Sequence, residues 1–123
     1  MILGTGIDII EIERIKKAIN RWGKSFIEHI FREEEIAYAE KHQSPTQHYA
    51  VRFAAKEAVY KAVGTEPHLS WKDILISNDR YGRPQAAILN KPFPNKIYLS
   101  LSHSKYYAVA SAIIEKSEEE LQK

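Results

Sequence analysis

Cysteine is absent from the chain, which excludes disulfide bonds and thiolate metal sites. No apolar run approaches the roughly 20 residues that a membrane-spanning helix needs, so we expect no membrane segment. The apolar beginning of the sequence has no basic leader and is interrupted by Asp8 and two glycines, so we expect no signal peptide. Together these absences predict a cytoplasmic protein.

No charge of one sign dominates either. The sequence has 18 Lys and Arg against 16 Asp and Glu, a net charge of +2, which is too even to favour nucleic acid as a partner. Hydrophobic residues make up 44% and charged residues 28%, close to the averages of globular proteins. We therefore expect residues 1–123 to form a single domain with a packed core.

The order of hydrophobic patterns predicts an α+β fold. We expect a strand at 2–10, then helices at 11–22, 25–31, 32–42 and about 46–63. Further strands are expected at 72–79, 85–89, 96–102 and 106–114, followed by a polar tail that is frayed or helical. This order of one strand, several helices and an antiparallel meander is typical of the α+β class.

The helix ending in "RFAAKEAVYKAVG" (52–64) carries an acid–base pair, Glu57 and Lys61. On a helical wheel, Ala50, Ala54 and Gly64 lie within about 60° of Glu57, which leaves room for close approach. The pair has two interpretations, a surface ion pair worth roughly 0.2–0.5 kcal/mol or the working face of a site. The helix alone favours the surface pair.

Asp8 places a carboxylate inside an apolar strand, in "GTGIDII". It either caps the helix that follows or serves as a ligand, because a buried carboxylate needs a partner. If the strand packs on the long helix, Asp8 and Glu57 converge. Two carboxylates suit Mg²⁺, which completes its shell with water and phosphate oxygens. The "GTG" at 4–6 is too short to indicate a dinucleotide-binding loop.

"SLSHSKYY" places His103 at the end of a strand, between Ser102 and Ser104 and near Lys105. Such a turn is either an ordinary surface turn or a site for phosphate oxygens. A serine nucleophile is not favoured, because the sequence has no nucleophile elbow. "DRYGRP" is interpreted as a hairpin turn with Gly82 at positive φ.

Helix 11–22 has a basic face and an apolar face. The basic residues are Arg14, Lys17 and Arg21. The apolar residues are Ile12, Ile15, Ile19 and Trp22. The basic stripe is either solvated or a docking face for an acidic protein, and it is too short to indicate nucleic-acid binding.

Three segments, "GIDIIEIERI" at 6–15, "RFAAKEAVYKAVG" at 52–64 and "LSLSHSKYYAVASAI" at 99–113, closely resemble one family. This is the short, single-domain class of 4′-phosphopantetheinyl transferases, the bacterial holo-acyl-carrier-protein synthases. The resemblance covers essentially the whole chain, with "GRP" at 82–84 at a Gly-basic-Pro turn of that family.

The resemblance implies Mg²⁺-dependent transfer of 4′-phosphopantetheine from coenzyme A to a serine of apo-acyl carrier protein, in fatty acid biosynthesis. Adenosine 3′,5′-bisphosphate is the second product. The proton of the serine would pass to a metal-associated water or, as the second choice, to Glu57. The family also implies a homotrimer with active sites between subunits.

By position, the resemblance assigns each candidate residue a role. Asp8 and Glu57 would bind Mg²⁺, and Lys61 would contact the transferring phosphate. The coenzyme A site would include Arg52, Gly82, Arg83, Pro84, His103 and Ser104. The acidic carrier protein would dock on Arg14, Lys17 and Arg21. Arg52 lies about 140° from Glu57 on the wheel, so its role depends on a subunit boundary.

Two other functions remain open from the residues. One is a non-catalytic module that binds an acidic protein through the basic stripe. The other is a Mg²⁺-dependent phosphohydrolase that uses the same carboxylates with water as the nucleophile.

Overall fold

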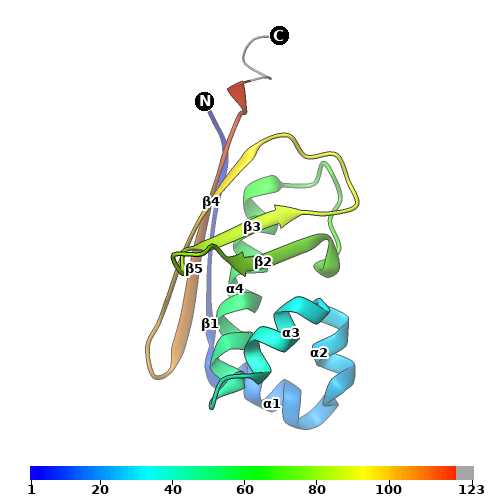
Figure 1. Cartoon of the computed structure of the whole chain (residues 1–123), viewed down its shortest axis with the longest axis vertical. Coiled ribbons are helices and arrows are strands. Elements are labelled where there is room, and N and C mark those ends of the chain that lie inside the picture. Colours follow the sequence, from blue (N-terminus) through cyan, green and yellow to red (C-terminus); the bar gives the residue numbers. More distant parts are fainter. Residues whose placement is uncertain (119–123) are drawn as a thin grey trace.

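The computed structural model describes residues 1–118 and has an α+β architecture in which one long helix lies across a face of a sheet (Figure 1). The helices and strands are β1 (Ile2–Glu11), α1 (Ile12–Trp22), α2 (Lys24–Ile30), α3 (Glu33–Glu40), α4 (Pro45–Val63), the 3₁₀ helix η1 (Trp71–Asp73), β2 (Ile74–Asn78), β3 (Pro84–Ile88), β4 (Lys96–His103) and β5 (Tyr107–Glu115). The predicted fold class and order of elements are confirmed. The polar tail beyond residue 118 lies outside the described residues.

The strands form two separate antiparallel sheets rather than one meander. The first sheet has the order β1-β5-β4, and the second is the hairpin β2-β3. The first strand of the chain therefore pairs with the last, with Asp8 opposite Ala110. No local pattern in the sequence specifies this long-range pairing, whereas the β2-β3 and β4-β5 hairpins follow from their turns.

Two glycines of β1 allow α4 to pack directly on the strand. A Cβ atom added at Gly4 would lie 2.0 Å from the carbonyl oxygen of Ala62, and one at Gly6 would lie 2.0 Å from that of Ala58. The "GTG" sequence is therefore a packing feature. Because side chains alternate along a strand, Asp8 lies on the same face as the two glycines and points toward α4.

Helix α4 is buried on more sides than the wheel predicted. Ala50 and Ala54, expected to line an open polar face, have no exposed surface, so that expectation is wrong. Their small side chains instead let the helix approach the sheet, where Ala108, Ala110 and Ala112 of β5 are also buried. The polar side chain of Lys56 is likewise fully buried. After its partly exposed first turn (45–48), the helix keeps only a narrow strip that includes Glu57, Tyr60 and Lys61 partly or fully exposed.

Helix α1 matches its predicted faces except at its end. Arg14, Lys17 and Arg21 are exposed, and Ile15 is buried in the core. Trp22, expected on the apolar side, is 55% exposed, and the guanidinium of Arg21 lies 4.6 Å from the centre of its ring. The helix ends at Gly23, which has a positive φ, before the tryptophan can turn toward the core.

The face of the three-stranded sheet opposite α4 is open to solvent in the single chain and carries exposed apolar side chains beside small polar ones such as Ser100 and Ser102. Ile7 is 66% exposed and Ile9 is 64% exposed, both on the side of β1 that points away from α4. Tyr98 of β4 and Ile113 of β5, which pair across the strands, add to this face. Exposed apolar surfaces of this kind are uncommon on monomeric proteins and usually mark an interaction site.

Within residues 1–118, no helix is both long enough and apolar enough to cross a membrane. The cytoplasmic location stays a prediction.

Candidate functional site

The predicted site residues fall into two groups at opposite edges of the three-stranded sheet. Asp8 lies on the edge strand β1, and His103 lies at the end of the other edge strand, β4. Glu57 and Lys61 join Asp8, whereas Arg52 faces the region around His103. We call the first group the carboxylate site and the second the cationic cleft.

Asp8 and Lys61 form the contact that holds the carboxylate site together. The Lys61 ammonium donates to Asp8 Oδ1 at 3.2 Å and to the carbonyl oxygen of Ile7 at 3.0 Å. Asp8 does not cap α1, whose N-cap is Glu11 without a side-chain hydrogen bond. The predicted convergence of Asp8 with the long helix is confirmed.

Glu57 is close enough to Asp8 for the two carboxylates to repel. Partial burial is the main cause that raises the pKa of Glu57, the charge of Asp8 raises it further, and Lys61 opposes both. Two carboxylates therefore share one ammonium, which leaves excess negative charge at the site. This excess is the electrostatic signature expected where a further cation binds.

The donor set fits Mg²⁺ better than a metal enclosed by protein ligands. In the described part of the chain, no group of three or more His, Cys, Asp or Glu side chains is arranged to hold a metal ion. Asp8 and Glu57 supply two carboxylates, which matches the usual protein share of a Mg²⁺ shell that is completed by water and phosphate oxygens. In this structure, the ammonium of Lys61 is the positive charge that lies beside Asp8.

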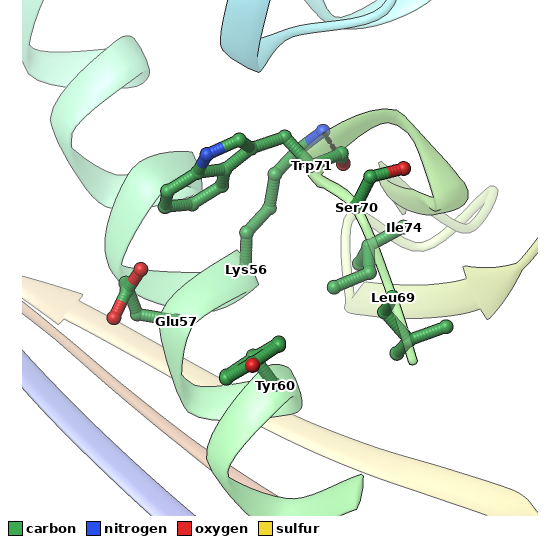
Figure 2. Close-up of a pocket in the computed structure, with 7 residues that line it drawn as sticks. All are labelled: Lys56, Glu57, Tyr60, Leu69, Ser70, Trp71 and Ile74. Atoms are coloured by element: carbon green, nitrogen blue, oxygen red, sulfur yellow. Dashed lines mark hydrogen bonds between the residues drawn. The ribbon is translucent and has the colours of Figure 1, made fainter. Parts of the chain in front are cut away.

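A cavity of about 260 Å³ opens beside Glu57 (Figure 2). Its walls are mostly apolar and are formed by Lys56, Glu57, Tyr60, Leu69, Ser70, Trp71 and Ile74. Trp71 is fixed by stacking on Phe53, with ring centroids 5.1 Å apart. No sequence pattern predicted this cavity, because Leu69, Ser70 and Trp71 of its wall lie between the helix expected at about 46–63 and the strand expected at 72–79.

Hydrogen bonds at η1 hold the tryptophan wall of this cavity. The backbone N and the hydroxyl of Ser70 both donate to Asp73 Oδ2 at 2.9 Å, and Lys91 forms an ion pair with the same oxygen at 3.1 Å. These contacts, led by the Ser70 backbone N–H, lower the pKa of Asp73 to about 2. The wall is therefore preorganised by an ionised carboxylate.

The cationic cleft has a volume of about 280 Å³ and lies between α4, the β2-β3 hairpin and β4. It is lined by Tyr38, Gln47, His48, Val51, Arg52, Asn78, Gly82, Pro84, Leu101 and His103. Four residues that the sequence analysis singled out, Arg52, Gly82, Pro84 and His103, thus meet in one cleft.

Arg52 provides a buried cation in this cleft. Its side chain belongs to a residue only 4% exposed, and its guanidinium lies 3.9 Å from the centre of the Tyr38 ring. Burial lowers the pKa of Arg52, and among residues 1–118 its buried Nε has no hydrogen-bond partner. The guanidinium of Arg52 therefore gives the wall of the cleft a positive charge that suits an anion.

Histidines extend the cationic wall, and the sequence analysis identified only one of them. The ring of His48 stacks on that of His42, with centroids 3.8 Å apart. His103 accepts a hydrogen bond on Nδ1 from the side-chain amide of Gln47 at 2.8 Å. The segment "HQSPTQH" gave no signal for this cluster beyond the presence of two histidines around Pro45.

Two predicted binding residues do not line the cleft. The backbone N of Arg83 donates to Asp79 Oδ1 at 2.9 Å, which closes the turn that follows β2, and its side chain is exposed. Ser104 closes the β4-β5 turn, since its backbone N donates to the carbonyl oxygen of Tyr107 at 2.8 Å. Gly82 has φ 82°, as predicted for a hairpin turn. The roles of Arg83 and Ser104 stay predictions.

Comparison with known proteins gives a consistent result. Residues 4–112 match the family model of the 4′-phosphopantetheinyl transferase superfamily. Over 114 residues, the chain is 44% identical to the holo-[acyl-carrier-protein] synthase of Thermodesulfovibrio yellowstonii, covering 93% of this chain and 99% of the relative. Over 116 residues, it is 47% identical to that of Chloroherpeton thalassium, covering 89% and 95%.

The fold is also similar to solved structures. The crystal structure of a holo-(acyl-carrier-protein) synthase from Bacillus anthracis, in complex with CoA (3′,5′-ADP), matches with a TM-score of 0.82 at 41% identity. The match covers 95% of this chain and 99% of that one.

Proposed function

The chain belongs to the 4′-phosphopantetheinyl transferase superfamily, and we propose that it transfers 4′-phosphopantetheine from coenzyme A to a serine of apo-acyl carrier protein. The reaction releases adenosine 3′,5′-bisphosphate and serves fatty acid biosynthesis. The observation that carries the proposal is the convergence of Asp8, Glu57 and Lys61 where β1 packs on α4. We also propose that residues 1–123 form one domain.

The carboxylate site would bind Mg²⁺ through Asp8 and Glu57. Bound there, the ion would neutralise charge on the pyrophosphate of coenzyme A, as phosphoryl transfer requires. Lys61 is half exposed on a flexible stem, so its ammonium can move from Asp8 to the phosphate oxygens and stabilise charge on them. Among the groups of the chain, Glu57 is suited to accept the proton of the serine, because partial burial and the charge of Asp8 raise its pKa above the ordinary value of a glutamate.

The apolar cavity beside Glu57 is suited to the pantetheine arm. With the transferring phosphate at the carboxylate site, the arm extends from it into an adjoining space. The cavity that Trp71 and Tyr60 border begins at Glu57 and combines apolar walls with the hydroxyl of Ser70 (Figure 2).

The cationic cleft would bind the nucleotide end of coenzyme A through Arg52 and His103, with Gly82 and Pro84 beside the adenosine. Since this cleft and the carboxylate site lie at opposite edges of the sheet, we propose that neighbouring subunits each supply one of them. The exposed apolar face around Ile7 and Ile9 supports a homotrimer, because a second copy of this chain would cover it. A cyclic trimer places one edge of each chain beside the opposite edge of the next.

The acidic carrier protein would dock on Arg14, Lys17 and Arg21. These residues form an exposed row on α1, with Glu13 as an acidic neighbour four residues before Lys17.

Intact-mass measurement of a carrier protein tests the proposal. Incubated with coenzyme A, apo-carrier protein and Mg²⁺, the wild-type chain should add the mass of one phosphopantetheine to the carrier. Asp8→Ala and Glu57→Ala should reduce the rate at least about 100-fold, the size of a lost transition-state contact. Glu33→Ala, at an exposed position of α3, should not.

Three outcomes decide between the alternatives. Phosphate release without a mass shift would support the phosphohydrolase. Carrier binding without any reaction would support the binding module. Full-rate transfer by either carboxylate variant would contradict the assignment of the site.

A further inference from the structure

The cationic cleft contains a histidine, His48, to which the resemblance to the family assigned no role. We propose that His48 binds a phosphate group of the nucleotide as an imidazolium, so that a proton is taken up when the ligand binds. This inference rests on the proposed function, since the phosphate is one that coenzyme A carries.

Arg52 shows that the cleft is built for an anion. Its guanidinium is buried, and its Nε donor has no partner among the described residues, although the residue lines the open cleft. Desolvation of an arginine in this position is costly, and a phosphate oxygen would offset that cost with a charge-assisted hydrogen bond.

His48 also lines the cleft, one turn earlier in α4 and four residues before Arg52. Residues at this spacing lie on one side of a helix, so a ligand that reaches Arg52 also reaches the imidazole of His48. His103 approaches from β4, and its Nδ1 is occupied by the Gln47 amide, which leaves Nε2–H as its donor. The three side chains come from two elements and face one space.

The groups around His48 are cationic or neutral. His42 stacks on it, Arg52 and His103 flank it in the cleft, and Tyr38 contacts its ring edge. Within residues 1–118, no Asp or Glu lines the cleft.

The charged groups outside the cleft lie near Arg52 and Tyr38 rather than near His48. The negative charge of Glu35 raises the pKa of Arg52, and the ammonium of Lys41 lies 4.9 Å from the centre of the Tyr38 ring. In the free protein, therefore, no carboxylate of the cleft offsets a positive charge on His48.

His42 supports the ring of His48. Its Nδ1 donates to the carbonyl oxygen of Tyr38 at 2.7 Å, which fixes the His42 ring in place. The two rings stack with centroids 3.8 Å apart, and His48 is the one that lines the cleft. We therefore assign the phosphate contact to His48.

The direction of the pH effect follows from these charges. Burial, and then the neighbouring His42, Arg52 and His103, lower the pKa of His48 in the free protein, which favours its neutral form. A phosphate dianion reverses the local potential and raises the pKa of His48 in the complex. Binding then takes up a proton and weakens as pH rises through the pKa of the complex, by at most about tenfold per pH unit for one proton.

Histidine NMR on the full chain tests the proposal directly. The ring signals of His48 are assigned by their loss in His48→Gln and followed from pH 5 to pH 8.5, with and without adenosine 3′,5′-bisphosphate. The titration midpoint of His48 should rise by at least one pH unit when the ligand is bound. An unchanged midpoint, or no binding of this ligand to the wild-type chain, would overturn the proposal.

Calorimetry in buffers of different ionisation heat provides the second readout. The phosphates of the ligand also take up protons near pH 6. The proton uptake of His48 is therefore obtained as the difference in proton uptake between wild type and His48→Gln. His48→Gln should bind about tenfold more weakly at pH 6, and near equally at pH 8.5, while His68→Gln, at an exposed position, should match wild type. Equal affinity of His48→Gln and wild type at pH 6 would contradict the proposal.

The inference and the proposed function fail in different ways. If carrier protein is modified but the midpoint of His48 does not move, only this inference is wrong. If adenosine 3′,5′-bisphosphate binds with proton uptake at His48 but carrier protein is never modified, the inference stands as a nucleotide-binding property and the transferase assignment fails.

Discussion

Gly4 and Gly6 determine how closely β1 approaches α4, and through that contact they position Asp8. The carbonyl oxygens of Ala58 and Ala62 occupy the space that a Cβ would need at either glycine. Asp8 is the next residue on the same face of β1, within reach of Lys61. A site made from a strand and a helix thus depends on two residues without side chains.

We expect Gly6→Ala to be destabilising and to reduce transfer. The added methyl group must displace the backbone of Ala58, and such overpacking typically costs about 1–3 kcal/mol in the free energy of unfolding. Because the strand moves away from α4, Asp8 moves with it, so transfer should fall more than the folded fraction does. Urea unfolding and the carrier mass assay measure the two effects.

Glu33→Ala is the control, since Glu33 is exposed on α3, outside the packing of β1 on α4. It should leave transfer unchanged and alter the stability by less than the glycine variant does. If Gly6→Ala unfolded at the same urea concentration as wild type, close packing of β1 on α4 would not be what the glycine provides.

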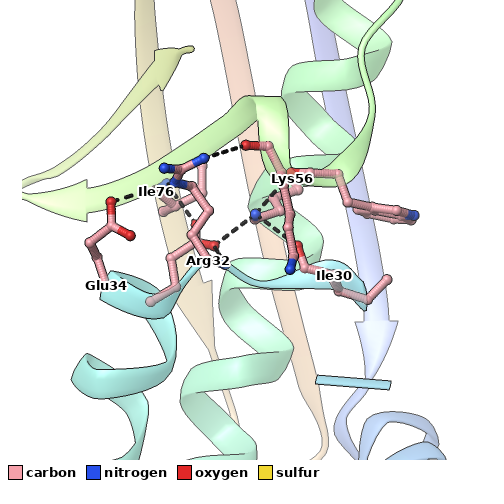
Figure 3. Close-up of polar contacts among 8 residues, drawn as sticks. Ile30, Arg32, Glu34, Lys56 and Ile76 are labelled. Carbon is pink, nitrogen blue, oxygen red and sulfur yellow. Dashed lines mark hydrogen bonds and ion pairs between the residues drawn. The ribbon is translucent and has the colours of Figure 1, made fainter. Parts of the chain in front are cut away.

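At the scale of elements, a buried ion pair joins the helical half of the chain to the strands. Lys56 Nζ of α4 lies 2.7 Å from Glu35 Oε1 of α3, and neither side chain is exposed. The ammonium also donates to two carbonyl oxygens, those of Ile30 and Trp71, at 3.0 Å each. The carboxylate accepts two backbone N–H groups, those of Arg32 and Ile76, at 2.8 Å each (Figure 3).

This network is satisfied at every charged atom and lies directly beside the site. Lys56 precedes Glu57, and its bond to the Trp71 carbonyl ties the tryptophan wall of the apolar cavity to α4 (Figure 2). The pair therefore orients two parts of the site without itself facing the carboxylates.

Removing one partner of this pair should lower the free energy of unfolding more than replacing both partners with apolar residues does. Glu35→Gln and Lys56→Met each leave one buried charge without its partner, and we expect each to lower the free energy of unfolding by about 3–5 kcal/mol. The double variant Glu35→Leu/Lys56→Met should cost less than the sum of the two. Urea unfolding of all three variants measures the coupling.

Glu34→Gln serves as the control, because it removes an exposed ion pair with Arg32. A surface pair of this kind is worth about 0–1 kcal/mol. Additive losses in the double variant would show that Lys56 and Glu35 stabilise the fold independently of one another.

The same elements show what the sequence could predict. Helix and strand positions followed from periodicity, and Asp8 could be placed near the long helix because a buried carboxylate needs a partner. The burial of Lys56 could not be predicted, since its partner Glu35 belongs to another helix and both residues look like ordinary surface charges. Arg52, Gly82, Pro84 and His103 of the cationic cleft were predicted, whereas Tyr38, His48 and Asn78 were not, because they meet only through tertiary packing.

At the scale of the whole molecule, a single chain separates the two halves of the proposed site. The carboxylate site lies along β1, the cationic cleft lies beside β4, and β5 runs between them (Figure 1). The open apolar face of the same sheet offers a surface through which copies can assemble. In a ring, the carboxylate site of one chain would meet the cleft of the next, and every boundary would form one complete site.

Mixing two inactive variants tests this arrangement. Glu57→Ala removes a carboxylate and Arg52→Ala removes the buried cation, so each variant alone should be nearly inactive. If chains of both kinds are unfolded together in equal amounts and refolded, about one quarter of the boundaries should combine an intact carboxylate site with an intact cleft. Transfer should therefore recover to about a quarter of the wild-type rate in the carrier mass assay. If each chain held a whole site, every site would carry one defect and mixing would restore nothing. A control mixture of Glu57→Ala with Asp8→Ala should also stay inactive, because both changes fall in the same half of the site.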